Sequence, residues 1–289
     1  MKQSKFDKPS SRKALHFLPF CALALLLSAC AKMGQPDGGW YDETPPQVIA
    51  ESPSDGATGV NSKKATLYFS EYIKIDNPTE NVVVSPPQKE APEIKNEGKK
   101  ISVKLIDDLK PNTTYTIDFS NAISDNNEGN PLGNYTYTFS TGDHIDTMEV
   151  AGCVVEADNL EPVKGILVGL YDNLADSAFT TLPMLRVART DDTGHFDIKG
   201  VRNGKYHVFA LQDADNNYMF NAKSEMIAFD KTVYATTCRP DIRQDTIWRD
   251  SLHIQDIKRI PYTHFLPDNI VLRAFNEELT DRYFQKTDR

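Results

Sequence analysis

The stretch LKPNTTYTIDF, residues 109–119, decides the fold of this chain. Its large side chains Tyr115, Ile117 and Phe119 alternate with polar ones. A period of two is typical of a β-strand that has one buried face and one face in water. The Pro-Asn turn before Tyr115 predicts a tyrosine corner, in which the phenol hydroxyl bonds to backbone a few residues upstream.

The same alternation recurs on both sides of this stretch. Apolar and polar residues alternate within residues 66–70, 101–105 and 135–140. Turns that contain Pro and Gly separate these segments, for example at residues 52–56. Short strands at this spacing over about 100 residues are typical of a β-sandwich, which we expect over residues 45–142.

Five short motifs follow one another in this segment. They are SPSDGA at 52–57, YFSE at 68–71, LKPNTTY at 109–115, ISD at 123–125 and FSTG at 139–142. In this order they resemble the bacterial Ig-like domain of S-layer proteins and of many Bacteroidetes lipoproteins. The resemblance implies a spacer or adhesion module without catalytic activity.

A second group of strands is expected after residue 147. Apolar runs occupy residues 150–155, 163–171 and 205–211, and the motif TDDTGHF lies at 190–196. The order G-x-V, apolar strand, T-D-x-x-G-x-F and G-x-Y is similar to carboxypeptidase regulatory-like (transthyretin-like) domains. That resemblance implies a second small sandwich over residues 147–237 and no chemistry of its own. The predicted fold is therefore all-β, with two sandwiches in tandem.

The tail, residues 238–289, has a looser pattern. Residues 246–248 and 270–275 have the composition of strands, without an obvious third sandwich around them. An apolar strand needs a sheet to join. We therefore expect residues 270–275 to begin a third β-domain, of which this chain carries only the start. The alternative is that they pair with the second sandwich.

The N-terminal segment has the layout of a secretory signal peptide. Residues 1–29 combine a basic start, an apolar run and small residues directly before Cys30. The ending Leu-Ser-Ala-Cys resembles the lipobox of bacterial lipoproteins, which implies that Cys30 is acylated and becomes the mature N-terminus. Residues 30–44 have the composition of a flexible tether. We expect a lipoprotein of the outer membrane, on its periplasmic or its cell-surface face.

Charge excludes one class of partner. The segment before Cys30 holds five of the 32 basic and one of the 41 acidic residues, so the remainder has a net charge of −13. This balance argues against nucleic acid, whose phosphates require a basic surface. Membrane attachment would therefore depend on the acyl chains. Apart from Cys30, the mature chain has two cysteines, Cys153 and Cys238, which form either one disulfide or two free thiols.

One loop has the composition of a cation site. Asp213, Asp215 and Asn217 alternate in a tight loop, as oxygen ligands do in the first half of an EF-hand calcium loop. The twelfth position is Ser224 in place of the usual glutamate, and Glu225 follows it. A calcium site is one interpretation, and an Asx-rich turn without a cation is the other. We expect no other cofactor.

No catalytic motif is present in the sequence. The six histidines lack metal-ligand spacing, and there is no G-x-S-x-G nucleophile motif. We expect a structural or protein-interaction module that binds another envelope protein, and no enzyme. The alternative is a glycan-binding surface lipoprotein of a polysaccharide-uptake system, with Trp40, Tyr218 and Trp248 as candidate aromatic contacts.

A recurring triplet consists of Asp, then Ser or Thr, then an apolar residue. It resembles the acceptor motif of Bacteroidetes protein O-glycosylation. Composition alone would give roughly one such triplet in a chain of this size. The four candidate hydroxyl residues are Thr147, Ser177, Thr246 and Ser251.

Overall fold

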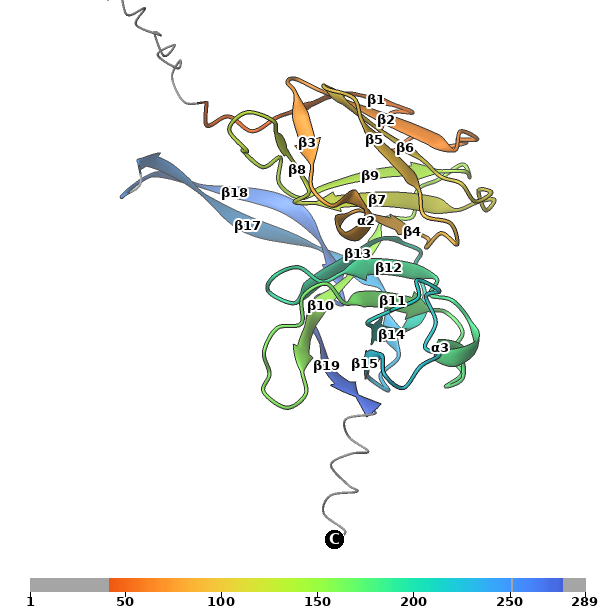
Figure 1. Ribbon diagram of the computed structural model, residues 1–289. Helices are drawn as coiled ribbons and strands as arrows, with labels where there is room; N and C mark the ends of the chain where they lie inside the picture. Colours follow the sequence, from red (N-terminus) through yellow and green to blue (C-terminus); the bar gives the residue numbers. More distant parts are fainter. Residues whose placement is uncertain (1–41, 251, 278–289) are drawn as a thin grey trace, which may run out of the picture. The chain divides into compact units, whose positions relative to one another are not determined.

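The structure is a computed structural model that describes residues 42–250 and 252–277. As predicted, the fold is all-β (Figure 1). The described residues from Glu43 onward belong to one compact unit. The predicted signal peptide, Cys30 and nearly all of the predicted tether lie outside the described residues. Within the described residues, no helix has the length and apolar character needed to span a membrane.

The first sandwich is built from short strands that follow the predicted alternation. Its elements are β1 (Val48–Ser52), β2 (Lys64–Phe69), β3 (Ile73–Ile75), α2 (Pro78–Asn81), β4 (Val83–Ser85), β5 (Glu93–Asn96), β6 (Lys100–Lys104), β7 (Thr114–Ser120), β8 (Ile123–Asp125) and β9 (Tyr135–Ser140). One sheet has the order β1–β2–β6–β5, a second has the order β4–β7–β9, and β3 pairs with β8.

The inward face of β7 confirms the predicted core. Tyr115, Ile117 and Phe119 are each at most 1% exposed and pack against residues of β2, β6 and β9. The backbone N–H of Lys110 donates to the Tyr115 hydroxyl at 2.8 Å, which confirms the tyrosine corner. This bond holds the turn before β7 against the strand.

The other face of β7 differs from the prediction. Thr114 and Thr116 are buried, although the alternation predicts that they face water. The second sandwich covers them, because the guanidinium of Arg186 bonds to both residues. A period of two cannot indicate that another domain covers the polar face.

The second sandwich follows directly. Its elements are β10 (Met148–Glu156), β11 (Leu167–Tyr171), α3 (Ala178–Thr181), β12 (Arg186–Arg189), β13 (His195–Val201), β14 (Lys205–Leu211), β15 (Met226–Phe229), β16 (Tyr234–Ala235) and β19 (Ile270–Asn276). The strands are joined in the order β12–β11–β14–β15–β19–β10–β13, and β16 pairs with β14. The two end strands meet, since Arg186 of β12 donates to the carbonyl of Lys199 in β13 at 2.7 Å.

The expectation of a third β-domain is wrong for residues 270–276. They form β19, which pairs parallel with β10 and antiparallel with β15 inside the second sandwich. Gly152 makes this possible, because a Cβ atom there would lie 2.1 Å from the carbonyl oxygen of Ile270. The second sandwich therefore extends to residue 276, beyond the predicted boundary at 237.

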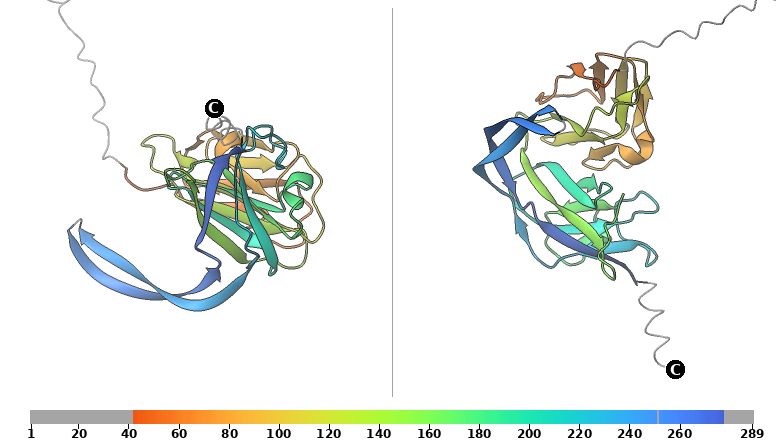
Figure 2. Two further views of the ribbon diagram at one scale, coloured as in Figure 1. Left: turned by 90° about the horizontal axis from the view of Figure 1, so that it is seen from below. Right: turned by 90° about the vertical axis from the view of Figure 1, so that its left-hand side faces the viewer.

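Two long strands lie between β16 and β19. They are β17 (Thr237–Asp250) and β18 (His253–Leu266), 14 residues each, and they pair only with each other within the described residues. Together they form a two-stranded antiparallel ribbon that projects beyond the sandwiches (Figure 2). We call it the β17–β18 ribbon. The sequence analysis predicted only a short strand at residues 246–248 here.

Candidate functional site

The loop after β14 gathers three carboxylates. Asp213, Asp215 and Glu225 have oxygen atoms within 4.8 Å of one another. Glu225 is buried and accepts hydrogen bonds from the backbone N–H groups of Ala214 and Ala222, both at 3.2 Å. These bonds fix Glu225 beneath the loop that carries the other two carboxylates.

Asn217, the third predicted ligand, bonds to other groups of the same loop. Its side-chain nitrogen donates to Asp215 at 2.8 Å, and its side-chain oxygen accepts from the backbone N–H of Met219 at 2.6 Å. Glu225 supplies the third carboxylate of the cluster. The signal for it in the sequence was a glutamate one position later than an EF-hand loop requires.

The pKa values of the two aspartates in the cluster shift in opposite directions. Burial, together with the neighbouring Asp215 carboxylate, raises the pKa of Asp213. A hydrogen bond from Asn221 lowers the pKa of Asp215. A hard cation would relieve the repulsion, and Ca²⁺ prefers six to eight oxygen ligands. Three carboxylates would supply only part of that shell, so calcium binding stays a prediction.

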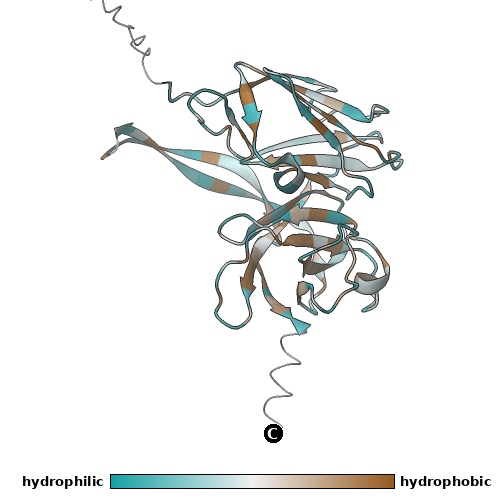
Figure 3. Ribbon diagram, in the orientation of Figure 1, coloured by the Kyte–Doolittle hydropathy of each residue, from teal (hydrophilic) through white to brown (hydrophobic). Residues whose placement is uncertain are grey.

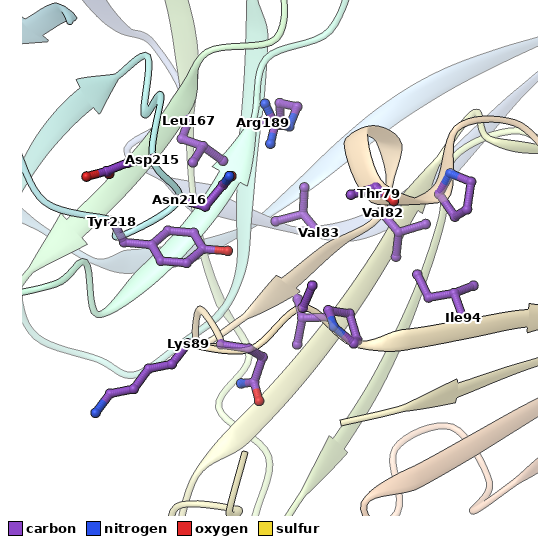
Figure 4. Close-up of a pocket in the computed structure, with 15 residues that line it drawn as sticks. Thr79, Val82, Val83, Lys89, Ile94, Leu167, Arg189, Asp215, Asn216 and Tyr218 are labelled. Carbon is purple, nitrogen blue, oxygen red and sulfur yellow. The ribbon is translucent and has the colours of Figure 1, made fainter. Parts of the chain in front are cut away.

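A cleft of about 450 Å³ lies beside this loop, between the two sandwiches (Figure 4). One wall comes from α2 and from strands β4 and β5 of the first sandwich. The other comes from β11, β12 and the acidic loop of the second. The walls include Thr79, Val82, Val83 and Ile94 on one side and Leu167, Arg189, Asn216 and Tyr218 on the other.

Polar groups of the cleft come from both sandwiches, with Gln88 and Lys89 in the first and Arg189 and Tyr218 in the second. Arg189 donates to the carbonyl of Gly165 at 2.7 Å, and none of the described carboxylates lies within ion-pair distance of it. Burial lowers the pKa of Arg189 and raises that of Tyr218. The Tyr218 hydroxyl points towards Val83, whereas the Asp215 carboxylate points away from the cleft (Figure 4). This mixture of apolar and polar groups suits a small polar ligand.

A buried arginine joins the two sandwiches. Arg186 is 5% exposed, and its guanidinium donates to the backbone carbonyls of Ser85, Thr114 and Lys199 and to the Thr116 hydroxyl. Burial lowers its pKa to about 10, so it keeps its charge at neutral pH. The sequence analysis missed this contact, because an arginine is seldom so deeply buried.

The β17–β18 ribbon has two chemically different faces. Residues that pair directly across an antiparallel ladder share a face, so the register assigns the paired side chains; it shifts on both sides of Trp248, where the ladder passes over Arg249 and Gln255. Ile242, Trp248, Ile254 and Ile257 share one face, and each is more than half exposed. Brown bands along the ribbon mark its hydrophobic residues (Figure 3). We call this the apolar face; it consists of Pro240, Ile242, Gln244, Thr246, Trp248, Ile254, Ile257, Arg259, Pro261 and Thr263.

The opposite face of the ribbon is charged. Arg239 lies 3.8 Å from Asp241, and Arg243 lies 3.2 Å from Asp245, each pair on one strand. Asp256 pairs with Ile247 and so also lies on this side. The ten residues that define the apolar face include no carboxylate and one cation, Arg259.

The predicted modification sites lie in separate places. Thr147 and Ser177 are exposed outside the strands, and Thr246 is exposed within β17. Ser251 lies outside the described residues. Exposure allows modification at the first three residues, and O-glycosylation of all four stays a prediction.

The two cysteines of the described residues are free thiols. Cys153 is half-buried in β10, and Cys238 is exposed in β17. The structure therefore has the second of the two alternatives left open by the sequence. The candidate aromatic contacts for a glycan do not share one site: Tyr218 lines the cleft, Trp248 lies on the ribbon, and Trp40 is outside the described residues.

The first sandwich matches a known family. Residues 42–141 fit the family model of the bacterial Ig-like domain. This match agrees with the predicted segment and with the tyrosine corner, and we use the name Ig-like domain for the first sandwich below. Such domains are typical of structural or surface modules. No curated protein sequence matches the chain.

Solved structures similar to the chain have low sequence identity. The copper resistance protein PcoC of Escherichia coli is 18% identical over 34% of this chain and 98% of its own, with a TM-score of 0.26. The N-terminal part of the bacterial S-layer protein SbsC is 13% identical over 60% of this chain and 42% of its own (TM-score 0.24). The T6 backbone pilin of Streptococcus pyogenes is 11% identical over 78% and 66% (TM-score 0.22). At such scores nothing about function follows from these similarities.

Proposed function

We propose that this protein is a non-enzymatic lipoprotein of the outer membrane, anchored through Cys30, that serves as a structural or protein-interaction module. The observation that carries the proposal is the exposed apolar face of the β17–β18 ribbon. Ile242, Trp248, Ile254 and Ile257 are each more than half in water. Exposed apolar side chains gathered on one face are typical of a docking site.

The rest of the molecule supports a role in presenting this surface. Arg186 and its carbonyl partners fasten the Ig-like domain to the second sandwich. The ribbon leaves the second sandwich after β16 and returns to it through β19. The two sandwiches can therefore hold the base of the ribbon in place.

The surroundings of His264 support a non-enzymatic role. His264 contacts Asp241 at 3.1 Å and Asp268 at 2.6 Å, which could orient a catalytic base. Its one other hydrogen-bond partner among the described residues is the Tyr262 hydroxyl at 3.4 Å, and no described Ser, Thr or Cys side chain bonds to its ring. A nucleophile within hydrogen-bond reach of the base is required for catalysis of the triad type.

Crosslinking in native outer membranes tests the proposal. The wild-type chain is compared with a variant in which residues 242–261 are replaced by Asn-Gly, a two-residue turn that suits the shortened hairpin. We expect a stoichiometric protein adduct that is lost in the shortened variant. Arg243→Ser, on the charged face, should keep the adduct. An adduct of unchanged yield in the shortened variant would exclude the ribbon as the docking element.

A second candidate function is supported by the cleft. Arg189, Asn216 and Tyr218 offer a cation, an amide and an aromatic ring around a volume of sugar size. Glycan binding would then take place in the cleft and not on the ribbon. Polysaccharide recovered with the wild-type and ribbon-shortened chains, but not with Tyr218→Ala, would favour this function.

A further inference from the structure

We infer that the apolar face of the β17–β18 ribbon packs against the apolar face of a second copy of this chain. The two ribbons would lie face to face, with the same strands antiparallel and the two bodies at opposite ends. This inference rests on the proposed function, in which the ribbon is the docking element, and it names the partner. Four properties of the ribbon lead to it.

The edges of the ribbon are poor sites for an added strand. A proline has no N–H to donate, so Pro240 in β17 and Pro261 in β18 must turn their nitrogen atoms outward for the ladder to continue. Each edge therefore lacks one of the donors that a docking strand would use. Prolines at edges are a common protection against strand addition. The face, and not the edge, is left as the contact surface.

Charge favours self-contact at the ribbon over self-contact elsewhere. The chain from Cys30 onward has a net charge of −13, whereas residues 237–266 hold five Lys or Arg and four Asp and have a net charge of +1. The other residues of this mature chain therefore carry −14, which opposes contact between two bodies of this chain. The apolar face carries no carboxylate, so two copies of it do not bring acids together.

The order of side chains along the face is complementary to itself. From the base to the tip, the directly paired positions are Ile242 with Pro261, Gln244 with Arg259, Thr246 with Ile257 and Trp248 with Ile254. A two-fold axis can lie across the width of the ribbon, between Gln244 and Thr246. Of these four pairs, it places the one nearest the base of one copy on the one nearest the tip of the second copy. Ile242 then packs on the second copy's Trp248, and Arg259 meets its Ile257 instead of another Arg259. Two-fold contacts of this type are the commonest in homo-oligomers.

The opposite arrangement, with both tips pointing the same way, is disfavoured by charge. It would place the two acidic bodies side by side, whereas the antiparallel arrangement separates them by the length of the ribbons. Strands of 14 residues extend over about 45 Å. This separation exceeds the Debye length of about 8 Å at physiological ionic strength.

The small area of the face indicates a weak contact. A ribbon about 45 Å long and about 10 Å wide offers about 450 Å² on one side, so two copies bury about 900 Å² in total. Stable complexes usually bury about 1,200–2,000 Å². We therefore expect a weak dimer in solution, with a dissociation constant in the range of about 10–100 micromolar.

Trp248 allows a direct test. The chain has two tryptophans, so Trp40→Phe leaves Trp248 as the single reporter. The variant would be started at residue 30 with Cys30→Ser, so that no acyl chain is attached. Between about 1 and 500 micromolar, we expect its emission to move to shorter wavelength as sedimentation velocity changes from monomer to dimer.

Two further substitutions distinguish the two faces. Ile242→Asp would place a carboxylate against the second copy's Trp248, and we expect it to weaken the dimer at least tenfold. Ile247→Asp is the matched control, with the same residue types on the same strand but on the charged face, and it should leave the dimer unchanged. Equal effects of the two substitutions would contradict the inference.

The remaining outcomes overturn the inference without ambiguity. A monomer at every concentration excludes the second copy; a ribbon-dependent crosslink to a different protein would then leave the proposed function intact. An emission shift that requires phosphatidylethanolamine vesicles, with no dependence on protein concentration, would assign the face to a lipid surface. Absence of both the dimer and any ribbon-dependent crosslink would reject the inference and the proposed function together.

Discussion

The junction between the two sandwiches and the β17–β18 ribbon are made from strands with the same alternation, yet they have opposite surroundings. At the junction, the polar residues Thr114 and Thr116 of β7 are buried beneath Arg186. On the ribbon, the apolar residues Ile242 and Trp248 are exposed on 14-residue strands, far longer than the usual five or six. The difference teaches that burial depends on which surface a strand meets, and not on the residue type alone.

Arg186→Met should weaken the contact between the two sandwiches and so lower the stability of the protein. The substitution leaves the carbonyl groups of Ser85, Thr114 and Lys199 without their charged donor in a buried place. We expect the free energy of unfolding to fall by about 3–5 kcal/mol, as when one partner of a buried charged network is removed. Urea unfolding measures this. Arg202→Met, at an exposed arginine of the same junction, should cost about 1 kcal/mol or less.

Gly152→Ala should detach β19, the strand that follows the ribbon, from the second sandwich. The added Cβ would overlap the carbonyl oxygen of Ile270, and β19 would have to leave β10. We expect a loss of about 3 kcal/mol, at the upper end for overpacking, with early release of the C-terminal segment under limited proteolysis. Val271→Thr, at an exposed position of β19, should change stability by less than about 0.5 kcal/mol. Unchanged proteolysis of Gly152→Ala would contradict the assigned role of the glycine.

Calcium should stabilise the folded protein near the junction of the two sandwiches, because the acidic loop borders the cleft between them. If Asp213, Asp215 and Glu225 hold a cation, calcium at about 100 times its dissociation constant adds about 2.7 kcal/mol of stability. Melting temperatures in calcium and in EGTA measure this. Glu225→Gln should abolish the shift, and Asp192→Asn in another turn should keep it. Identical melting temperatures in both buffers would reject the calcium site.

The base of the ribbon should respond to pH. Hydrogen bonds to Asp241 and Asp268 raise the pKa of His264 above its ordinary value. Protonated His264 therefore stabilises the folded base fully below pH of about 6.5, and this contribution is lost as pH rises through the raised pKa. Hydrogen exchange of β17 and β18, normalised for intrinsic rate, should accelerate in this window. His264→Gln should remove the pH dependence, and His207→Gln in the second sandwich should not.

The smallest change in the free energy of unfolding is expected for a substitution on the apolar face of the ribbon. Ile257→Val in dilute protein should change the free energy of unfolding by less than about 0.5 kcal/mol, because the removed methylene group is already in water. Ile117→Val in the core of the Ig-like domain should cost about 1 kcal/mol. Equal costs at the two positions would mean that the apolar face is covered within the folded monomer.

Local patterns predicted much of both sandwiches. The period of two in β7, the turn before it and the Tyr115 hydroxyl bond all involve residues close together in the chain. The acidic loop was predicted in the same way, since Asp213 and Asp215 are neighbours in sequence. Glu225 was missed as a member of the cluster, because the loop must close before its carboxylate comes near them.

The sequence by itself determined the all-β class, the inward residues of most strands, and the chemistry of the turns, since these depend on neighbours along the chain. The tertiary structure alone decided that β19 completes the second sandwich, that Arg186 is buried at the junction, and that β17 and β18 stand free. The physical reason is that pairing and burial between distant segments depend on which surfaces exclude water together. An alternating strand carries the same pattern whether its second face meets a domain, a partner or solvent.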